Sequence, residues 1–315
     1  MENVVKTTES TTFSQAQNES SKKLPGLYCE LTKIRLSALV VVTTAVGFIM
    51  VSPAGIEWMV LLWTVLGTTC CAAAAAALNQ VIEQSRDSRM HRTQQRPLPS
   101  GRLSAAHAFI IGVVLSYVGV AILSFGANIA AAGIALLTIL LYVLIYTPLK
   151  AKTSLNTILG AIVGALPPLI GSVAAFGTIE TGGLIIAGIL FVWQLPHFLS
   201  LAWMYREDYA RGGFKMLPAI DQSGGIASRA SLMTCLLLVP LSLLLTLTGF
   251  TGVLFAITGS LLSIWLTARA YVFWKRRDDA SARKLFFGTI MYLPILLGLM
   301  LIDRETIQWI ELTGM

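Results

Sequence analysis

Apolar residues dominate this chain in long runs, and polar residues gather in the segments between the runs. A helix needs about 20 apolar residues to cross the hydrocarbon core of a bilayer. Irregular backbone finds no hydrogen-bond partner in lipid, so we expect each run to be a helix. The fold class is therefore all-α, a polytopic membrane protein with nine transmembrane helices in one bundle. We predict these helices over Arg35–Val51, Trp58–Leu78, Ala105–Phe125, Ile129–Tyr146, Leu155–Phe176, Leu184–Trp203, Ala230–Thr248, Val253–Ala270 and Leu285–Ile302.

The composition supports a membrane protein. Hydrophobic residues make up 55% of the 315 residues, charged residues make up 12%, and the mean hydropathy is +0.73. An ordinary soluble domain carries about twice this share of charged residues. The composition therefore excludes a disordered chain, a disulfide-rich module and most soluble folds.

The basic residues predict an orientation. Of the 23 Lys and Arg residues, only Arg304 falls on the side of the membrane opposite to the others. Cytoplasmic loops collect Lys and Arg, so we predict a cytoplasmic N-terminus and an outside C-terminus. The same rule explains the net charge of +7 without a nucleic-acid partner.

The two ends of the chain differ from the membrane domain, which we place at residues 31–305. Residues 1–30 are polar and predict a flexible cytoplasmic tail, and residues 306–315 predict a short outside tail. The N-terminal segment lacks the apolar stretch of a signal peptide. It also contains acidic residues and no Arg before Arg35, unlike a mitochondrial transit peptide. We therefore expect a bacterial cytoplasmic (inner) membrane.

The second predicted helix ends in a polar stripe. Asn79, Glu83 and Asp87 are spaced four residues apart. At about 100° per residue, their side chains fall within about 80° of one helix face. Mg²⁺ is usually held by one or two carboxylates together with substrate phosphates. The alternative is a solvated helix end with ordinary pairing between successive turns.

Basic residues follow this stripe and the fourth predicted helix. Arg92 and Arg96 lie in the loop after the stripe, and Lys150 and Lys152 follow a Tyr-Thr-Pro-Leu segment. Guanidinium groups suit phosphate oxygens, and carboxylates that hold Mg²⁺ beside such cations can bind a diphosphate. The alternative is that these residues only set the topology.

The sixth predicted helix carries a histidine within the membrane, in the segment Trp193-Gln194-Leu195-Pro196-His197-Phe198. An intramembrane His is a functional candidate that can bind a porphyrin iron, bond a propionate or move a proton. The alternative is a hydrogen bond between helices.

A second acidic cluster follows this helix. Glu207 and Asp208 lie between Arg206 and Lys215, four helices after the first cluster. This spacing is a weak sign of internal duplication. Two facing clusters can hold two Mg²⁺ around one diphosphate.

Taken together, these segments resemble the UbiA-type intramembrane prenyltransferase superfamily, and within it the protoheme IX farnesyltransferase (heme O synthase) branch. The resemblance runs from Leu31 to Ile302. Quinone-pathway relatives show acids where this chain has Gln80, Tyr205 and Tyr209, which favours the heme branch. The segments that carry the resemblance are the Asn79, Glu83 and Asp87 stripe, Asp87–Leu98, Tyr146–Lys150, Gly164–Pro168 and Trp193–Phe198.

The resemblance implies that farnesyl diphosphate and protoheme IX are the substrates, heme O is the product and Mg²⁺ is the cofactor. A heme A synthase or a terminal oxidase is a partner expected of the family. The implied catalytic residues are Asn79, Glu83, Asp87 and His197, and the implied metal ligands are Asn79, Glu83, Asp87, Glu207 and Asp208. The implied diphosphate-binding residues are Arg92, Arg96, Lys150, Lys152, Arg206 and Lys215. The residues implied to contact heme or farnesyl are Tyr146, Trp193, Gln194, His197 and Tyr205.

Two other functions fit parts of the sequence. A prenyltransferase acting on an aromatic acid or quinone precursor would use the same stripe. A secondary transporter would also have many spans and a repeat, but transporters place their binding groups near the membrane midplane. In this chain the acids stand at helix ends on one side.

Overall fold

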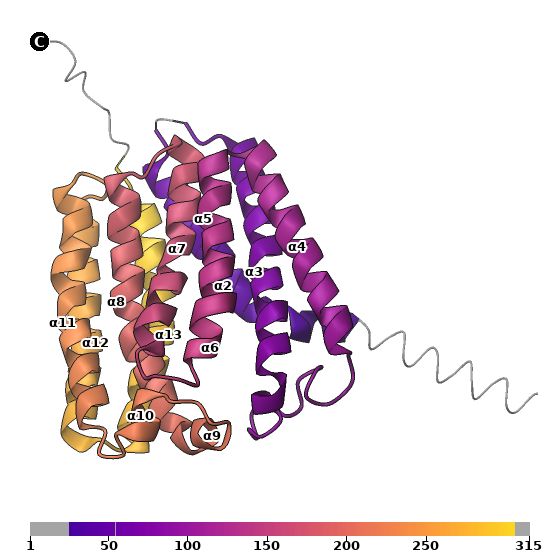
Figure 1. Cartoon of the computed structure of the whole chain (residues 1–315). Helices are drawn as coiled ribbons and strands as arrows, with labels where there is room; N and C mark the ends of the chain where they lie inside the picture. The colour runs from indigo at the N-terminus through magenta and orange to yellow at the C-terminus, as the bar shows by residue number, and fades with distance from the viewer. Residues whose placement is uncertain (1–24, 54, 306–315) are drawn as a thin grey trace, which may run out of the picture.

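The computed structural model describes residues 25–53 and 55–305, and nearly all of them are helical (Figure 1). Nine helices in this part of the chain are long and apolar enough to cross a membrane, which confirms the predicted all-α bundle. They are α2 (Ile34–Val51), α3 (Trp58–Asp87), α4 (Ala105–Gly126), α5 (Ile129–Leu140) with its continuation to Leu149, α7 (Asn156–Phe176), α8 (Thr181–Met204), α11 (Gly225–Leu247), α12 (Val253–Arg276) and α13 (Asp279–Ile302).

Several helices extend beyond the apolar runs at the end of the bundle that carries the basic loops. Helix α3 continues past Leu78 to Asp87, α12 continues past Ala270 to Arg276, and α13 begins at Asp279. The length of an apolar run matches the thickness of the hydrocarbon core. The helix itself can be longer, because it ends only where its backbone hydrogen bonding ends. The acidic stripe therefore stands on a continuous helix at the membrane boundary.

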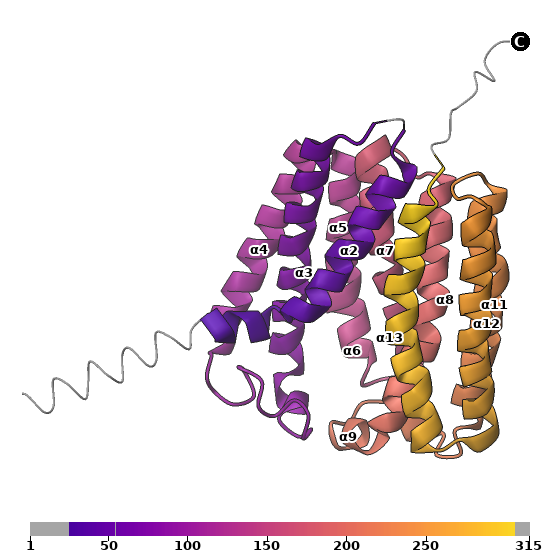
Figure 2. The ribbon, with the colours of Figure 1, turned by 180° about the vertical axis from the view of Figure 1, so that it is seen from behind.

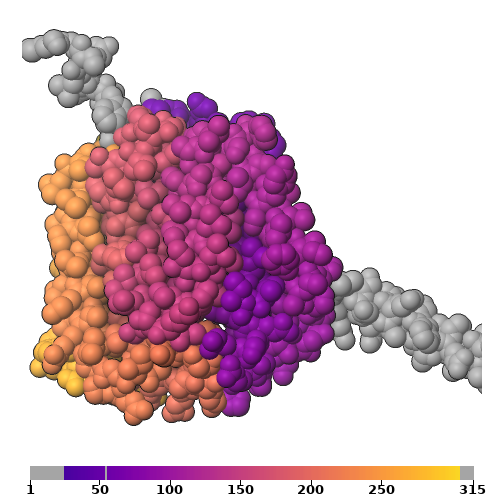
Figure 3. All heavy atoms as spheres, in the orientation of Figure 1, coloured from indigo at the N-terminus to yellow at the C-terminus, as the bar shows by residue number. Residues whose placement is uncertain are grey.

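Consecutive long helices pack against each other within two halves of the bundle. Helices α2 to α5 form one half and α7, α8, α11 and α12 form the other, with α13 packed against α2, α8 and α12 (Figures 1 and 2). The halves meet mainly through α2 and α7. The short helices α9 (Arg206–Arg211) and α10 (Leu217–Ile220) close the lower end of the second half, where Figure 3 shows the orange segment.

Small residues let α2 and α7 approach closely. A Cβ atom at Gly47 would collide with the backbone of Pro168, and one at Gly171 would collide with the backbone of Thr44. Small residues allow such close contact between membrane helices. In the same helix, Gly160 lies against Tyr146. Helix α7 therefore forms a tight central wall between the two halves.

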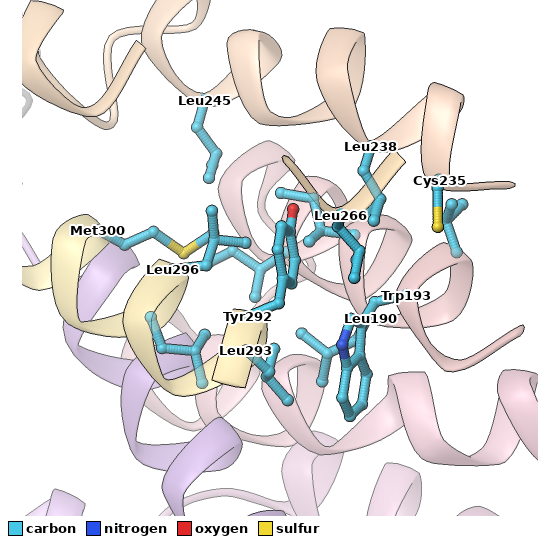
Figure 4. Packing of buried hydrophobic residues seen from close by; sticks show 14 of the residues in the cluster. Leu190, Trp193, Cys235, Leu238, Leu245, Leu266, Tyr292, Leu293, Leu296 and Met300 are labelled. Atoms are coloured by element: carbon cyan, nitrogen blue, oxygen red, sulfur yellow. The ribbon is translucent and has the colours of Figure 1, made fainter. Parts of the chain in front are cut away.

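Each half has its own apolar core. The core of the second half includes Tyr292 of α13. Its side chain is fully buried among residues of α8, α11, α12 and α13 (Figure 4). Its hydroxyl lies 2.9 Å from the hydroxyl of Ser263, so the buried polar group is satisfied. The first half buries Leu123, Ala135 and Ile139 between α3, α4, α5 and α7. Two packed cores hold the helix ends at fixed positions.

The two ends of the bundle carry different segments. Arg304 donates a hydrogen bond to the carbonyl of Ser52 at one end, whereas the long polar loops lie at the other (Figure 1). Residues 25–31 are helical, and Glu30 pairs with Arg102 at 2.8 Å. The rest of the predicted N-terminal tail and residues 306–315 lie outside the described residues.

Candidate active site

The acidic stripe at the end of α3 is buried. Asn79, Glu83 and Asp87 are 0%, 4% and 1% exposed. The Asn79 amide donates to the hydroxyl of Thr147 at 3.0 Å. Burying a carboxylate without a partner costs free energy, so Glu83 and Asp87 need charged or hydrogen-bonding partners. The groups that contact these side chains therefore determine which ligands the stripe can bind.

A change of helix type brings Lys150 to the stripe. Helix α5 continues as the π-helix η1 (Leu141–Tyr146) and the short helix α6 (Thr147–Leu149). The segment leads into Pro148, which has no backbone N–H, and the Thr147 hydroxyl donates to the carbonyl of Tyr142 at 2.7 Å. Single π-turns are frequent at functional sites.

Lys150 pairs directly with the stripe. Its Nζ lies 2.9 Å from Oε1 of Glu83 and 4.6 Å from the centre of the Tyr146 ring. Burial lowers the pKa of Lys150, but the Glu83 carboxylate outweighs burial and holds this pKa well above its ordinary value. The Glu83 carboxylate therefore favours the charged form of Lys150 beside the stripe.

Lys33 also contacts the stripe, which the sequence analysis did not predict. Its Nζ donates to Oδ1 of Asn79 at 2.7 Å. Burial, together with the positive charges of Arg96 and Lys150, lowers the pKa of Lys33 to about 7. Lys33 has left-handed backbone angles (φ 48°, ψ 51°) immediately before α2. The only sequence signal was its position just before the first span, where topology alone accounts for a Lys.

Arg96 completes the cationic surroundings. Its Nη1 lies 2.6 Å from Oδ2 of Asp87, whereas the buried Oδ1 of Asp87 has no hydrogen-bond partner in the described part of the chain. Three basic side chains, Lys33, Lys150 and Arg96, thus contact a stripe with two carboxylates. This arrangement favours an anionic ligand, and the free oxygen of Asp87 offers a hard ligand for a divalent cation.

An apolar cavity adjoins the stripe. It has a volume of about 110 Å³ and is lined by residues of α2, α3, α5, η1 and α7. Ala76 lines the cavity one turn before Asn79, and Tyr142 lines it from the π-helix. A charged cluster therefore stands beside an apolar chamber, which suits an amphiphilic molecule with an anionic head.

The second acidic cluster has a different environment. Asp208 accepts hydrogen bonds from the backbone N–H groups of His91 at 2.8 Å and Arg92 at 3.3 Å, and from Arg211 at 2.7 Å. Although partial burial raises the pKa of Asp208, these donors lower it below its ordinary value. Asp208 thus ties the loop after α3 to α9, and both of its carboxylate oxygens accept hydrogen bonds. Glu207 is exposed.

The remaining arginines predicted to bind diphosphate, Arg92 and Arg206, make different contacts. The guanidinium carbon of Arg92 lies 5.2 Å from the ring centre of Tyr205, and its Nη2 donates to the Tyr209 hydroxyl at 3.2 Å. Arg206 instead binds the carbonyl of Trp203 at 2.8 Å and Asp279 at 2.7 Å, on α8 and α13. The structure thus places Arg206 in contacts between helices and not with the stripe.

Lys152 and Lys215 are both exposed. The backbone N–H of Lys215 donates to the carbonyl of Lys150 at 2.7 Å, which joins the segment after α9 to the segment after α6. This contact fixes the backbone on either side of the site without using the Lys215 charge.

The aromatic segment of α8 packs against α13. Trp193 is buried and its indole N–H donates to the carbonyl of Thr289 at 2.9 Å. His197 Nδ1 lies 2.9 Å from the Thr289 hydroxyl, and its ring stacks between Trp193 and Phe286. Gln194 is buried against Gly164 of α7. These contacts belong to the bundle core, and they do not join His197 to the stripe.

No group of three or more His, Cys, Asp or Glu residues that could hold a metal ion occurs within residues 25–53 and 55–305. Any metal bound at the stripe would therefore depend on oxygen atoms from a ligand as well as on Glu83 and Asp87. This requirement matches the way Mg²⁺ binds with substrate phosphates.

The comparisons with known proteins identify the class. The sequence profile of the UbiA prenyltransferase family matches residues 40–293. The chain belongs to the UbiA prenyltransferase family, and it is an enzyme of prenyl transfer in a polytopic membrane fold. The predicted family and enzyme class are confirmed.

The chain has relatives in one branch of the family. It is 41% identical over 286 residues to the protoheme IX farnesyltransferase of Solibacter usitatus, a match that covers 88% of this chain and 98% of the relative. Two solved structures share the fold. A digeranylgeranylglyceryl phosphate synthase has a TM-score of 0.75 at 19% identity, covering 90% of this chain and 98% of that one. A UbiA homologue from Archaeoglobus fulgidus bound to DMAPP and Mg²⁺ has a TM-score of 0.67 at 14% identity, covering 87% and 98%.

Proposed function

We propose that this enzyme transfers the farnesyl group of farnesyl diphosphate to a vinyl group of protoheme IX, which gives heme O. The observation that carries this proposal is the buried stripe of Asn79, Glu83 and Asp87, with cations around it and an apolar cavity beside it. The relative from Solibacter usitatus, which bears the name of this activity, supports the choice of substrates.

The residues of the stripe fit a divalent metal, and we propose Mg²⁺. Glu83, the free oxygen of Asp87 and the amide oxygen of Asn79 would hold it, since these are hard ligands. Mg²⁺ held by these residues would supply positive charge to a diphosphate leaving group. The homologue bound to DMAPP and Mg²⁺ supports this choice.

The cationic side chains would bind the diphosphate oxygens. Lys150 and Arg96 balance the carboxylates in the structure, and Lys33 occupies the amide oxygen of Asn79. We infer that these cations turn to the diphosphate when a metal takes the carboxylate oxygens. Their charges then stabilise the leaving group where negative charge develops.

The apolar cavity would hold part of the farnesyl chain and exclude water from the reacting carbon. An allylic cation reacts quickly with water, so a dry chamber protects it. Tyr142 lines this chamber, and its ring centre lies 5.3 Å from that of Tyr146. Their faces can stabilise a cation through the ring quadrupole.

His197 and Tyr205 are proposed to act on the heme side of the reaction. The hydrogen bond of His197 Nδ1 to Thr289 leaves Nε2 for a propionate or for the water that adds after the vinyl group attacks. Tyr205 is exposed at the end of α8, next to Arg92. Trp193 supports His197 by stacking, with ring centres 5.1 Å apart.

We further propose that the enzyme lies in the bacterial inner membrane with its stripe facing the cytoplasm. The concentration of basic loops at the stripe end supports this orientation. A heme A synthase or a terminal oxidase would use the product.

Pigment analysis of membranes that overproduce the chain tests the proposed reaction. We expect heme O to accumulate when farnesyl diphosphate and protoheme IX are available. An inactive Asp87→Asn variant, inserted to the same level, is the matched control. Accumulation of a prenylated aromatic acid in place of heme O would contradict the proposal and favour the quinone-precursor reaction.

A further inference from the structure

A groove, separate from the apolar cavity beside α3, lies on the outer wall of the bundle. It runs between α12 and α13 at the end that carries the basic loops. Figure 2 shows α13 on this face, and α12 packs against it. The groove has a volume of about 540 Å³. Its lining residues fall into a basic group, Arg269, Arg283 and Lys284, and an apolar group that includes Trp265, Phe287 and Met291.

The basic group carries unbalanced positive charge. Within the described residues, Arg269, Arg283 and Lys284 form no ion pair. The groove has one acid, Asp279, but Arg206 already pairs with it at 2.7 Å. The groove therefore attracts an anion, and a zwitterionic headgroup gains less because its own charges cancel.

The charged and apolar residues are ordered along the helices. Arg283, Phe287 and Met291 follow one another at four-residue intervals on α13, which corresponds to about 6 Å per step. On α12, Trp265 lies one turn deeper than Arg269, whose guanidinium carbon is 4.6 Å from the centre of its ring. The groove is basic toward the helix ends and apolar toward the membrane interior.

The groove is open to lipid. Phe287 and Met291 are 54% and 56% exposed, although both are large and apolar. Gly288 lies between them in the lining, where an added Cβ would stand 3.2 Å from Cδ of Arg269. The missing side chain leaves room in the groove beside the stem of Arg269.

We propose that this groove binds one anionic phospholipid. Its phosphate would contact Arg269, Arg283 and Lys284, and an acyl chain would lie along Phe287 and Met291. Basic pockets between membrane helices suit acidic headgroups, and the apolar extension suits the attached chain. The site is separate from the α3 stripe and does not depend on the reaction proposed above.

Native mass spectrometry of the full chain in detergent tests this site with phosphatidylglycerol and phosphatidylcholine as probes. We expect the wild type to retain one phosphatidylglycerol in preference to phosphatidylcholine. The variant Arg269→Gln/Arg283→Gln/Lys284→Gln should lose this preference by about 100-fold, because each basic residue adds attraction to an acidic headgroup.

A matched variant separates the groove from general surface charge. Arg229→Gln/Lys275→Gln/Arg276→Gln removes three exposed basic residues that do not line the groove, and it should keep the preference. An equal loss in this control, or no loss in the groove variant, would overturn the proposal.

A third variant tests the apolar half of the site. Phe287→Ala/Met291→Ala keeps all three basic residues, and it should release phosphatidylglycerol more readily than the wild type. Inorganic phosphate should fail to displace the lipid at equal concentration. Displacement by inorganic phosphate, or unchanged lipid retention in this variant, would show that the groove recognises a free anion and not a phospholipid.

Discussion

The two acidic clusters both follow an apolar span and have basic residues nearby, but their surroundings differ. The stripe on α3 contacts the side-chain cations Lys33, Lys150 and Arg96, and it adjoins the apolar cavity. After α8, Asp208 accepts hydrogen bonds from two backbone N–H groups and from the Arg211 side chain. Flexible side-chain cations can turn toward a ligand, whereas backbone N–H groups are fixed by the fold. We therefore propose that the first cluster carries the chemistry and that the second holds a loop.

The largest expected effect separates the two clusters by activity. Asp87→Asn should lower the rate of farnesyl transfer by about 10³-fold, because it removes an anionic oxygen proposed to hold the metal that stabilises the leaving diphosphate. Asp208→Asn should keep a rate near that of the wild type per folded molecule. Heme O formation by purified protein measures both rates. A larger loss of rate in Asp208→Asn than in Asp87→Asn would contradict the assignment of the chemistry to the first cluster.

The next effect concerns the cations of the first cluster. Lys150→Gln should lower kcat/KM for farnesyl diphosphate by about 100-fold, as expected for a group that stabilises developing charge. Lys275→Gln is the matched control, since Lys275 is an exposed lysine on α12. It should change kcat/KM by less than about 3-fold, within the usual effect of an exposed substitution. Equal losses would show that the effect is one of general charge.

A smaller effect tests the cavity that distinguishes the first half. Ala76→Leu should raise KM for farnesyl diphosphate by about 10-fold, because it adds three carbons to a lining position. The shorter geranyl diphosphate should be less affected. Ala130→Leu, at an exposed position of α5, is the control. Equal KM changes for both substrates would contradict a role of this cavity in holding the chain.

The smallest expected effect is on stability, and it belongs to the second cluster. Asp208→Asn should lower the free energy of unfolding by about 1–3 kcal/mol, the cost of weakened hydrogen bonds to a buried acceptor. Glu207→Gln, at an exposed neighbour, should change it by less than about 0.5 kcal/mol. Thermal unfolding in detergent measures both values. An unchanged free energy of unfolding in Asp208→Asn would contradict the proposal that Asp208 holds the loop after α3.

The fold could be predicted from the sequence because lipid imposes a simple rule on it. Apolar runs of membrane length must be helical, and they gave all nine spans. The stripe could also be predicted, since spacing on one helix is a local property. Asn79, Glu83 and Asp87 are indeed buried together on α3.

The contacts that distinguish the two clusters are not local. The Lys33 side chain reaches Asn79 across 46 positions, and the backbone N–H of His91 reaches Asp208 across 117. Neither contact follows from periodicity. The π-helix before Pro148 also lacks a clear sequence pattern, although it positions Thr147 beside Asn79. The resemblance that implied roles for Asp208 and Arg206 could not reveal their tertiary contacts with the loop after α3 and with Asp279.

The most direct test is the binding of Mn²⁺, a spectroscopic substitute for Mg²⁺, in the presence of farnesyl diphosphate. Electron paramagnetic resonance would count the bound ions in the wild type, in Glu83→Gln/Asp87→Asn and in Glu207→Gln/Asp208→Asn. We predict that the first double variant loses diphosphate-dependent Mn²⁺ binding and that the second retains the wild-type number. Retained binding in the first variant, or loss confined to the second, would contradict the assignment of the metal to α3.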